Sequence, residues 1–201
     1  MEANSPKGQG GLGPKLRGSG MSLQKQKIFG KPLITQAEVQ KRIRELGRMI
    51  TRDYAGKDLL LVGVLKGAFA FYADLARSID LPLEVGFINV SSYQGATHTS
   101  GKVKIVTDIS EEVKGKDVLL VEDIVDSGLT LSFLRKKFKA KKPSSLKVCS
   151  LLNKAEGRQV DVEIDYIGFD IPDKFIVGYG LDYDNQYRNL PYMAVLDAIP
   201  D

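Results

Sequence analysis

The sequence predicts an α/β protein in which a mainly parallel sheet is flanked by helices. Several short, continuously apolar runs are typical of strands that are covered on both faces. Segments with helical spacing separate some of these runs, which is the alternation expected of parallel strands. With 201 residues, 43% hydrophobic and 27% charged, the chain is long enough for one well-packed domain, which we expect over residues 21–201.

The first predicted helix spans residues 36–53. Thr35 and Glu38 form the T-x-x-E pattern of a capping box at its start, and apolar residues then recur along it at helical spacing. The remaining predicted elements are strands over 59–64, 83–90, 118–121, 146–152, 166–169 and 175–177, and helices over 68–79 and 130–138.

Residues 1–20 are expected to be a disordered tail or an expression leader. They are rich in glycine and lack apolar periodicity, so they cannot bury enough surface to offset their ordering entropy. Residues 1–27 carry five basic side chains against Glu2 alone, which accounts for the net charge of +4. The rest of the chain is formally neutral, and its basic run at 135–142 is expected to be a solvated helix face. We therefore expect no nucleic-acid partner.

Several other classes of protein are excluded by composition. No apolar run approaches the about 18 residues that span a bilayer, and the N-terminal segment lacks the apolar centre of a secretory signal. We therefore expect a soluble, cytoplasmic protein without a membrane partner. Cys149 is the only cysteine and His98 the only histidine, so neither an internal disulfide nor a Cys/His zinc site can form within one chain.

The segment with the most chemical information is 118–130, VLLVEDIVDSGLT. A buried strand leads into Glu122 and Asp123, passes two apolar residues and reaches Asp126. In an open α/β sheet, ligands bind beyond the carboxyl ends of the strands. The two adjacent carboxylates suit hydroxyl groups or a hydrated magnesium ion.

The end of this segment has the features of a phosphate-binding loop. Ser127 and Thr130 supply hydroxyl donors, Gly128 allows close approach of the backbone, and the helix dipole favours an anion. Leu129 stands where a Walker A loop requires lysine, so a nucleoside triphosphatase is a poor interpretation. The segment therefore predicts a site for a phosphate monoester.

Residues 91–102, SSYQGATHTSGK, are polar and unusually long for a simple connection. Residues 103–107 alternate apolar and polar side chains, so we expect a flexible two-stranded flap with the polar stretch as its tip. His98 lies in that tip and is assigned no chemistry.

Taken together, these motifs resemble those of a known family. VEDIVDSGLT resembles the phosphoribosyl pyrophosphate (PRPP) motif of type I phosphoribosyltransferases, VGVLKGAF at 62–69 looks like their pyrophosphate loop, and 91–102 looks like their flexible catalytic loop. SLLNK at 150–154 and DKFIVGYGLD at 173–182 look like the purine end of a hypoxanthine-guanine phosphoribosyltransferase. The resemblance covers about residues 28–197. It implies the type I phosphoribosyltransferase fold, with a small hood beside the sheet.

The activity that the resemblance implies is a step of purine salvage. The 5-phosphoribosyl group of PRPP is transferred to N9 of hypoxanthine or guanine, giving IMP or GMP and pyrophosphate. Mg²⁺ is the implied cofactor, and a homodimer or homotetramer is the implied assembly.

The resemblance also implies a role for individual residues. Asp126 is the proton-transfer residue near purine N7, and Ser92 and Tyr93 belong to the flexible loop. The ribose and 5′-phosphate of PRPP are held by Glu122, Asp123, Ser127, Gly128, Leu129 and Thr130. The pyrophosphate is met by Leu65, Lys66, Gly67 and Arg188, with a non-proline cis peptide between the first two.

The purine side of the site is implied in the same way. Lys154 donates to the 6-oxo group, which selects 6-oxopurines over adenine. Phe175 stacks on the base, the Ile176 backbone meets the purine edge, and Asp182 reaches the metal ion. The implied metal residues are therefore Glu122, Asp123 and Asp182.

Two other functions remain open from the sequence. A PRPP-sensing regulator that binds nucleic acid could use the same fold, although the formally neutral folded part argues against it. A phosphoribosyltransferase that prefers xanthine or a pyrimidine is the other alternative. The ranking of the bases and the oligomeric state are not set by any pattern in the chain.

Overall fold

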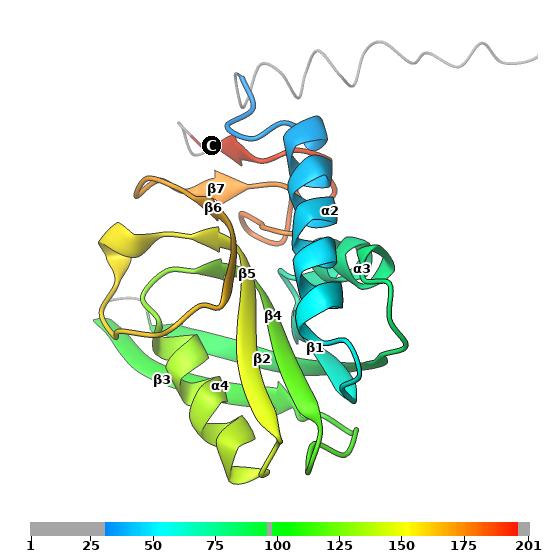
Figure 1. Ribbon diagram of the computed structural model, residues 1–201. Helices are drawn as coiled ribbons and strands as arrows, with labels where there is room; N and C mark the ends of the chain where they lie inside the picture. Colours follow the sequence, from blue (N-terminus) through cyan, green and yellow to red (C-terminus); the bar gives the residue numbers. More distant parts are fainter. Residues whose placement is uncertain (1–30, 96–97, 197–201) are drawn as a thin grey trace, which may run out of the picture.

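The computed structural model describes residues 31–95 and 98–196, and a six-stranded sheet with the order β3-β2-β1-β4-β5-β6 forms its centre (Figure 1). All neighbouring strands are parallel except β2 and β3, as the sequence predicted. The strands are β1 (Leu59–Leu65), β2 (Glu84–Gly95), β3 (His98–Thr107), β4 (Asp117–Val125), β5 (Ser145–Asn153) and β6 (Tyr166–Asp170).

Helices cover both faces of the sheet. They are α2 (Gln36–Asp53), α3 (Phe69–Ser78) and α4 (Leu129–Ala140), with a short 3-10 turn, η1 (Ala155–Gly157). The predicted bounds of α2 are confirmed, and both halves of its capping box form between Thr35 and Glu38. The other predicted helices agree with α3 and α4 to within two residues.

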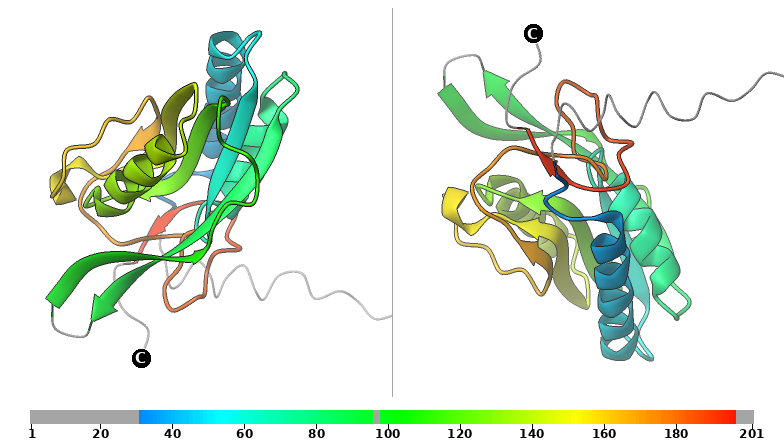
Figure 2. Two further views of the ribbon diagram at one scale, coloured as in Figure 1. Left: turned by 90° about the horizontal axis from the view of Figure 1, so that it is seen from below. Right: turned by 90° about the horizontal axis from the view of Figure 1, so that it is seen from above.

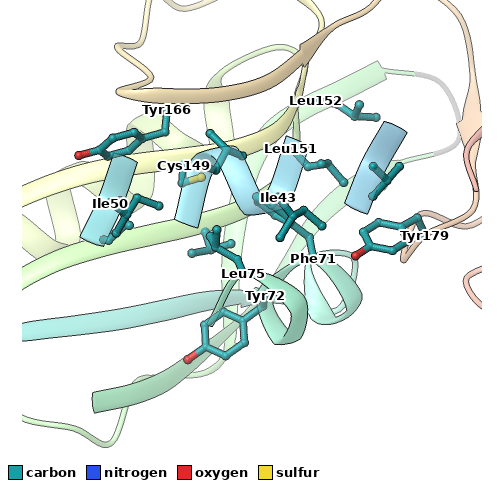
Figure 3. Close-up of a cluster of buried hydrophobic side chains, with 14 of the residues drawn as sticks. Ile43, Ile50, Phe71, Tyr72, Leu75, Cys149, Leu151, Leu152, Tyr166 and Tyr179 are labelled. Carbon is teal, nitrogen blue, oxygen red and sulfur yellow. The ribbon is translucent and has the colours of Figure 1, made fainter. Parts of the chain in front are cut away.

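Alternate residues of each central strand enter different cores. Leu59 and Leu61 of β1 pack with α2 and α3, whereas Leu60 and Val62 pack against α4. Figure 3 shows the first core, where side chains of α2, α3 and β5 meet around Phe71. Because β1, β4 and β5 are covered on both faces, their sequences are continuously apolar over most of their length. This burial fixes the central strands on which the polar loops are built.

The predicted two-stranded flap is confirmed, and its two strands are longer than the sequence indicated. β2 and β3 continue through most of residues 91–102, with Ser92 level with Val103 and Gly95 level with His98. Figure 2 shows this pair extending beyond the rest of the sheet. A backbone ladder needs no apolar side chains, which is why the polar stretch resembled a loop. Residues 96–97 and the placement of the Ser92 and Tyr93 side chains lie outside the described part.

A small second sheet forms the hood, which we define as residues 171–196. Its strands are β7 (Ile176–Val177) and β8 (Ala194–Val195), paired antiparallel. The segment before α2 joins it, because the N–H of Leu33 donates to the carbonyl of Met193 and the N–H of Met193 donates to that of Ile34. Figure 1 shows the hood beside the first turn of α2.

No helix in the described ranges is both long and apolar enough to cross a membrane. Residues 1–20, the expected tail or leader, lie outside the described residues.

The contact between α2 and α3 yields a first prediction. A Cβ atom at Gly47 would lie 2.3 Å from the backbone oxygen of Ser78. Alanine normally stabilises a helix by about 1 kcal/mol relative to glycine. Here Gly47→Ala should instead lower the free energy of unfolding by about 1–2 kcal/mol, because overpacking costs more than the propensity gain. Denaturant unfolding measures this, with Arg48→Ala on the exposed face as the control. A more stable Gly47→Ala protein would contradict the predicted close packing.

Candidate active site

Polar residues gather where the order of strands in the sheet reverses. After β1 the chain adds β2 and β3 on one side of β1. It then crosses over and adds β4 on the other side. At such a switch point the loops beyond the two strands separate and leave a crevice. Residues that follow β1 and residues that end β4 therefore face the same space.

A cavity of about 540 Å³ occupies this crevice. Its walls come from the end of β1, the connection from β4 to α4, the base of the flap and the hood. Many of the predicted site residues line it, namely Leu65, Gly67, Asp182, Arg188, Asp126, Glu122, Asp123, Ser127, Gly128, Leu129 and Thr130. The structure thus brings together segments that are far apart in the chain.

The paired acids lie within β4, which extends farther than the predicted strand at 118–121. Glu122 is only 5% exposed, and its burial and the neighbouring Asp123 raise its pKa well above the ordinary value. Burial raises the pKa of Asp123 to about 6, although its own N–H, the N–H of Ile124 and the charge of Arg188 act in the opposite direction. Hydroxyl donors or a cation would therefore be favoured at this pair.

The loop after β1 approaches these acids with its backbone. The peptide bond between Leu65 and Lys66 is cis, as the resemblance implied. A Cβ atom at Gly67 would lie 1.7 Å from Oδ2 of Asp123, so any other residue here would have to displace the Asp123 carboxylate. Lys66 is exposed and does not line the cavity. The groups that this loop offers to a ligand are therefore mainly its amides.

The connection from β4 to α4 holds the residues predicted to bind a phosphate. Gly128 precedes α4 with a φ of 81°, and a Cβ atom there would lie 2.5 Å from the carbonyl oxygen of Val160. The carbonyl of Ser127 accepts hydrogen bonds from the N–H groups of Gln159 and Val160 at 3.0 and 3.1 Å. These contacts fix the loop, and the first N–H groups of α4 have no partner within the helix. An anion is favoured at this position.

Parallel register places Asp126 beside Lys154. Val125 of β4 is level with Asn153 of β5, and the N–H of Lys154 donates to the carbonyl of Val125 at 3.0 Å. Nζ of Lys154 lies 2.7 Å from Oδ2 of Asp126 and 2.9 Å from Oδ1 of Asp173. Burial alone would lower the pKa of Lys154, but its hydrogen bonds to the two carboxylates outweigh burial and raise it. The side chain is therefore an ammonium ion at neutral pH.

The hood contributes a second ion pair. Nη2 of Arg188 lies 2.7 Å from Oδ1 of Asp182, and Nη1 donates to the carbonyl of Gly180 at 2.7 Å. Gly180 has a φ of 104°, and a Cβ atom there would lie 2.0 Å from the carbonyl oxygen of Gly67. The hood therefore packs directly on the loop after β1 and brings this pair to the cavity.

The residues predicted to meet the purine lie at or beyond the cavity edge. Phe175 is 54% exposed and meets Tyr183 edge-on, with ring centroids 5.9 Å apart. Ile176 is buried in β7. Neither Phe175 nor Ile176 lines the cavity. Lys154 does not line it either, but it forms an ion pair with Asp126, which does. The roles assigned to Lys154, Phe175 and Ile176 stay predictions.

A magnesium ion fits the donors that the cavity offers, provided that substrate and water complete its shell. Glu122, Asp123 and Asp182 present carboxylate oxygens, which are the ligands that this hard cation prefers. Within 31–95 and 98–196, no three acidic, histidine or cysteine side chains are close enough to hold a metal ion by themselves. The site therefore suits an ion that arrives bound to phosphate oxygens.

Sequence reasoning missed three features of the site. One is the contact of Asp173 with Lys154, although Asp173 begins the DKFIVGYGLD motif and could have been singled out there. Another is Gly157, where a Cβ atom would lie 2.1 Å from Oδ1 of Asp126. The third is an apolar wall from three adjoining strands, which no local pattern marks; it consists of Val64, Val90 and Val103.

The fold and the cavity together define the class of protein. A parallel sheet with a switch-point cavity, paired acids and a helix N-terminus that favours an anion is typical of α/β proteins that bind phosphorylated ligands. The family model for the phosphoribosyl transferase domain matches residues 34–184 of this chain.

Individual relatives narrow the assignment. The hypoxanthine-guanine phosphoribosyltransferase of Streptococcus thermophilus is 51% identical over 171 residues, which are 85% of this chain and 95% of the relative. That of Bacillus subtilis is 51% identical over 83% of this chain and 92% of its own. The crystal structure of a Staphylococcus aureus hypoxanthine phosphoribosyltransferase superposes with a TM-score of 0.82 at 42% identity, covering 86% and 94% of the two chains. The chain belongs to the hypoxanthine-guanine phosphoribosyltransferase family.

The close approach of η1 to Asp126 leads to a second prediction. In Gly157→Ala, the new methyl group must displace the Asp126 carboxylate, which is a movable side-chain end. Transferase turnover should fall by about 100-fold, the cost of a catalytic group misplaced by about 1 Å, with little change in melting temperature. Steady-state kinetics measures this, and the exposed Ala155→Ser in the same turn is the control. Unchanged turnover in Gly157→Ala would show that Asp126 is not held in this position.

The buried acids lead to a prediction about pH. The pKa of Asp123 is about 6 in the folded chain and about 4 when unfolded, so the folded state binds more protons between these values. Its contribution therefore lowers stability as pH rises from about 4 to about 6. Asp123→Asn should raise the melting temperature of the ligand-free protein at pH 7.5, and the gain should shrink towards pH 4.5.

The control for that comparison is Asp80→Asn, which removes an exposed carboxylate. Its effect on melting temperature should be small at both pH values. If Asp123→Asn instead lowered the melting temperature by the same amount at both pH values, the penalty for burying the Asp123 charge would be refuted.

Proposed function

We propose that the cavity transfers the 5-phosphoribosyl group of PRPP to N9 of hypoxanthine or guanine, releasing pyrophosphate and forming IMP or GMP. The observation that carries this proposal is the parallel register that places Asp126 and Lys154 beside the anion-binding loop. A proton-transfer group, a donor for the base and a phosphate site then lie within one crevice.

The loop 127–130 would bind the 5′-phosphate through its amides and hydroxyls at the start of α4. Glu122 and Asp123 would accept hydrogen bonds from the ribose hydroxyls, which suits two adjacent carboxylates whose pKa values are both raised. The amides of the loop after β1 and the guanidinium of Arg188 would meet the pyrophosphate. PRPP would thus lie across the crevice, with its 5′-phosphate at the start of α4 and its pyrophosphate at the loop after β1.

Lys154 would select the base. Its ammonium group has three N–H donors, of which Asp126 and Asp173 each accept one. The third can donate to the 6-oxo group of hypoxanthine or guanine. Adenine has an amino group at this position, which would set donor against donor. Phe175 would stack on the ring from the hood, where its exposed face is available.

Asp126 would move the proton at purine N7. As N9 bonds to the anomeric carbon, the base loses its N7 proton, and a carboxylate at the end of β4 can accept it. The alternative positions for this carboxylate are restricted by Gly157 on one side and by Lys154 on the other. Such restriction is what proton transfer at a single ring atom requires.

Glu122, Asp123 and Asp182 would hold Mg²⁺ together with phosphate and water oxygens. The ion supplies positive charge that favours departure of pyrophosphate. Apart from the ion, Arg188 offers positive charge from the hood side of the cavity.

The flap would keep water from the reacting carbon. Val90 of β2 and Val103 of β3 line the cavity, so the base of the flap already forms one of its walls. Ser92 and Tyr93 follow Val90 along β2. Their approach to bound PRPP would exclude water, which otherwise competes with the base for the ribosyl group.

Replacing the proton-transfer group tests this proposal. Asp126→Asn keeps an oxygen that can accept from Lys154 but cannot take up the N7 proton, so turnover of hypoxanthine and guanine should fall by about 100-fold or more. A spectrophotometric assay with PRPP and Mg²⁺ measures this, and PRPP binding should be retained. Near-normal turnover would remove Asp126 from the role. A wild-type protein that binds PRPP but turns over no base would favour a PRPP-sensing regulator instead.

A further inference from the structure

Lys154 is held by two carboxylates that come from different parts of the chain. Asp126 directly follows β4, whereas Asp173 lies between β6 and the hood strand β7. The Lys154 side chain is 13% exposed, and the side chains of Asp126 and Asp173 are 47% and 58% exposed. Lys154 is therefore the most enclosed of the three side chains, while either carboxylate can be hydrated.

The position of Asp173 is set by its backbone. The N–H of Ile171 donates to the carbonyl of Asn153 at 3.0 Å, which ties this segment to the end of β5 beside Lys154. The N–H of Asp173 itself donates to Oε2 of Glu156 in η1 at 3.3 Å. Both anchors lie within three residues of Lys154 in the chain, so Asp173 and Lys154 are fixed to the same framework.

Asp126 cannot serve the base and hold Lys154 fully at the same time. If its carboxylate accepts the purine N7 proton, its bond to the ammonium weakens as its charge is neutralised. An ammonium on a side chain that is only 13% exposed is costly to leave without a partner. Asp173 is the carboxylate that remains.

We infer that Asp173 is a positioning residue for base selection: it keeps Lys154 paired and pointed at the 6-oxo group when Asp126 engages the base. This inference rests on the proposed function, because it assumes that Lys154 meets the 6-oxo group. Without Asp173, Asp126 would be the only carboxylate paired with the ammonium group, and no second partner would keep the third N–H pointed at the base when Asp126 engages it.

Nucleotide binding tests this role without relying on turnover. IMP carries the 6-oxo group and a proton on N1, whereas purine ribonucleoside 5′-monophosphate has hydrogen at C6 and an unprotonated N1. The two nucleotides share the rest of the molecule. Isothermal titration calorimetry of both nucleotides against Asp173→Asn should show IMP weakened about tenfold or more, the loss expected when a hydrogen bond to a charged group is removed. The affinity for the 6-unsubstituted nucleotide should change by less than about twofold.

Two variants control for charge and for folding. Asp170→Asn removes an acid that bonds to Asn153 next to Lys154 without touching Lys154, and it should leave the ratio of the two affinities unchanged. Asp173→Glu keeps the carboxylate at an exposed position and should recover most of the IMP affinity. Equal weakening of both nucleotides by Asp173→Asn, or no weakening of either, would overturn the positioning role.

Lys154→Gln separates this inference from the function on which it rests. If Lys154→Gln lowers the affinity for IMP alone while Asp173→Asn does not, Lys154 selects the base and Asp173 does not position it. If Lys154→Gln weakens both nucleotides equally, the assignment of Lys154 to the 6-oxo group is wrong, and the role inferred for Asp173 falls with it.

Discussion

The parallel register of β1, β4 and β5 is the constraint on which the site depends. It places the ends of the three strands at one edge of the sheet. The loop after β1, the acids that end β4 and Lys154 after β5 therefore lie near one another, although they are far apart in the sequence. The strands hold this register because both of their faces are buried in apolar cores. A slip of one residue would send Asp126 to the opposite face of the sheet.

The same edge concentrates charge that the fold alone does not neutralise. Glu122 is buried and Asp123 is partly buried beside it, and their raised pKa values reflect a free-energy cost that is borne without a ligand. The two basic side chains nearby, Lys154 and Arg188, are each paired with a different acid, Asp126 and Asp182. Neither Glu122 nor Asp123 forms an ion pair within the part of the chain that the structure describes, which is the arrangement expected where stability is given up for binding.

Local patterns in the sequence were sufficient for the elements and for the central motif. The capping box and helical spacing predicted α2, and 122–130 was identified because acids, glycine and hydroxyls follow one buried strand. The two-residue strand β8 was missed because so short a run carries no periodicity. The contact of Asp173 with Lys154 was missed because it joins two loops through the tertiary fold. Family resemblance supplied the roles of Lys154 and Arg188, which spacing alone does not.

The central claim is that one crevice at the switch point binds a ribose 5-phosphate in a fixed orientation. A crystal structure of the protein with IMP tests this most directly. We expect the 5′-phosphate on the amides of 127–130, the ribose hydroxyls at Glu122 and Asp123, and the 6-oxo group beside Nζ of Lys154. A nucleotide bound with its phosphate away from this loop, or with its base directed away from Lys154, would contradict it.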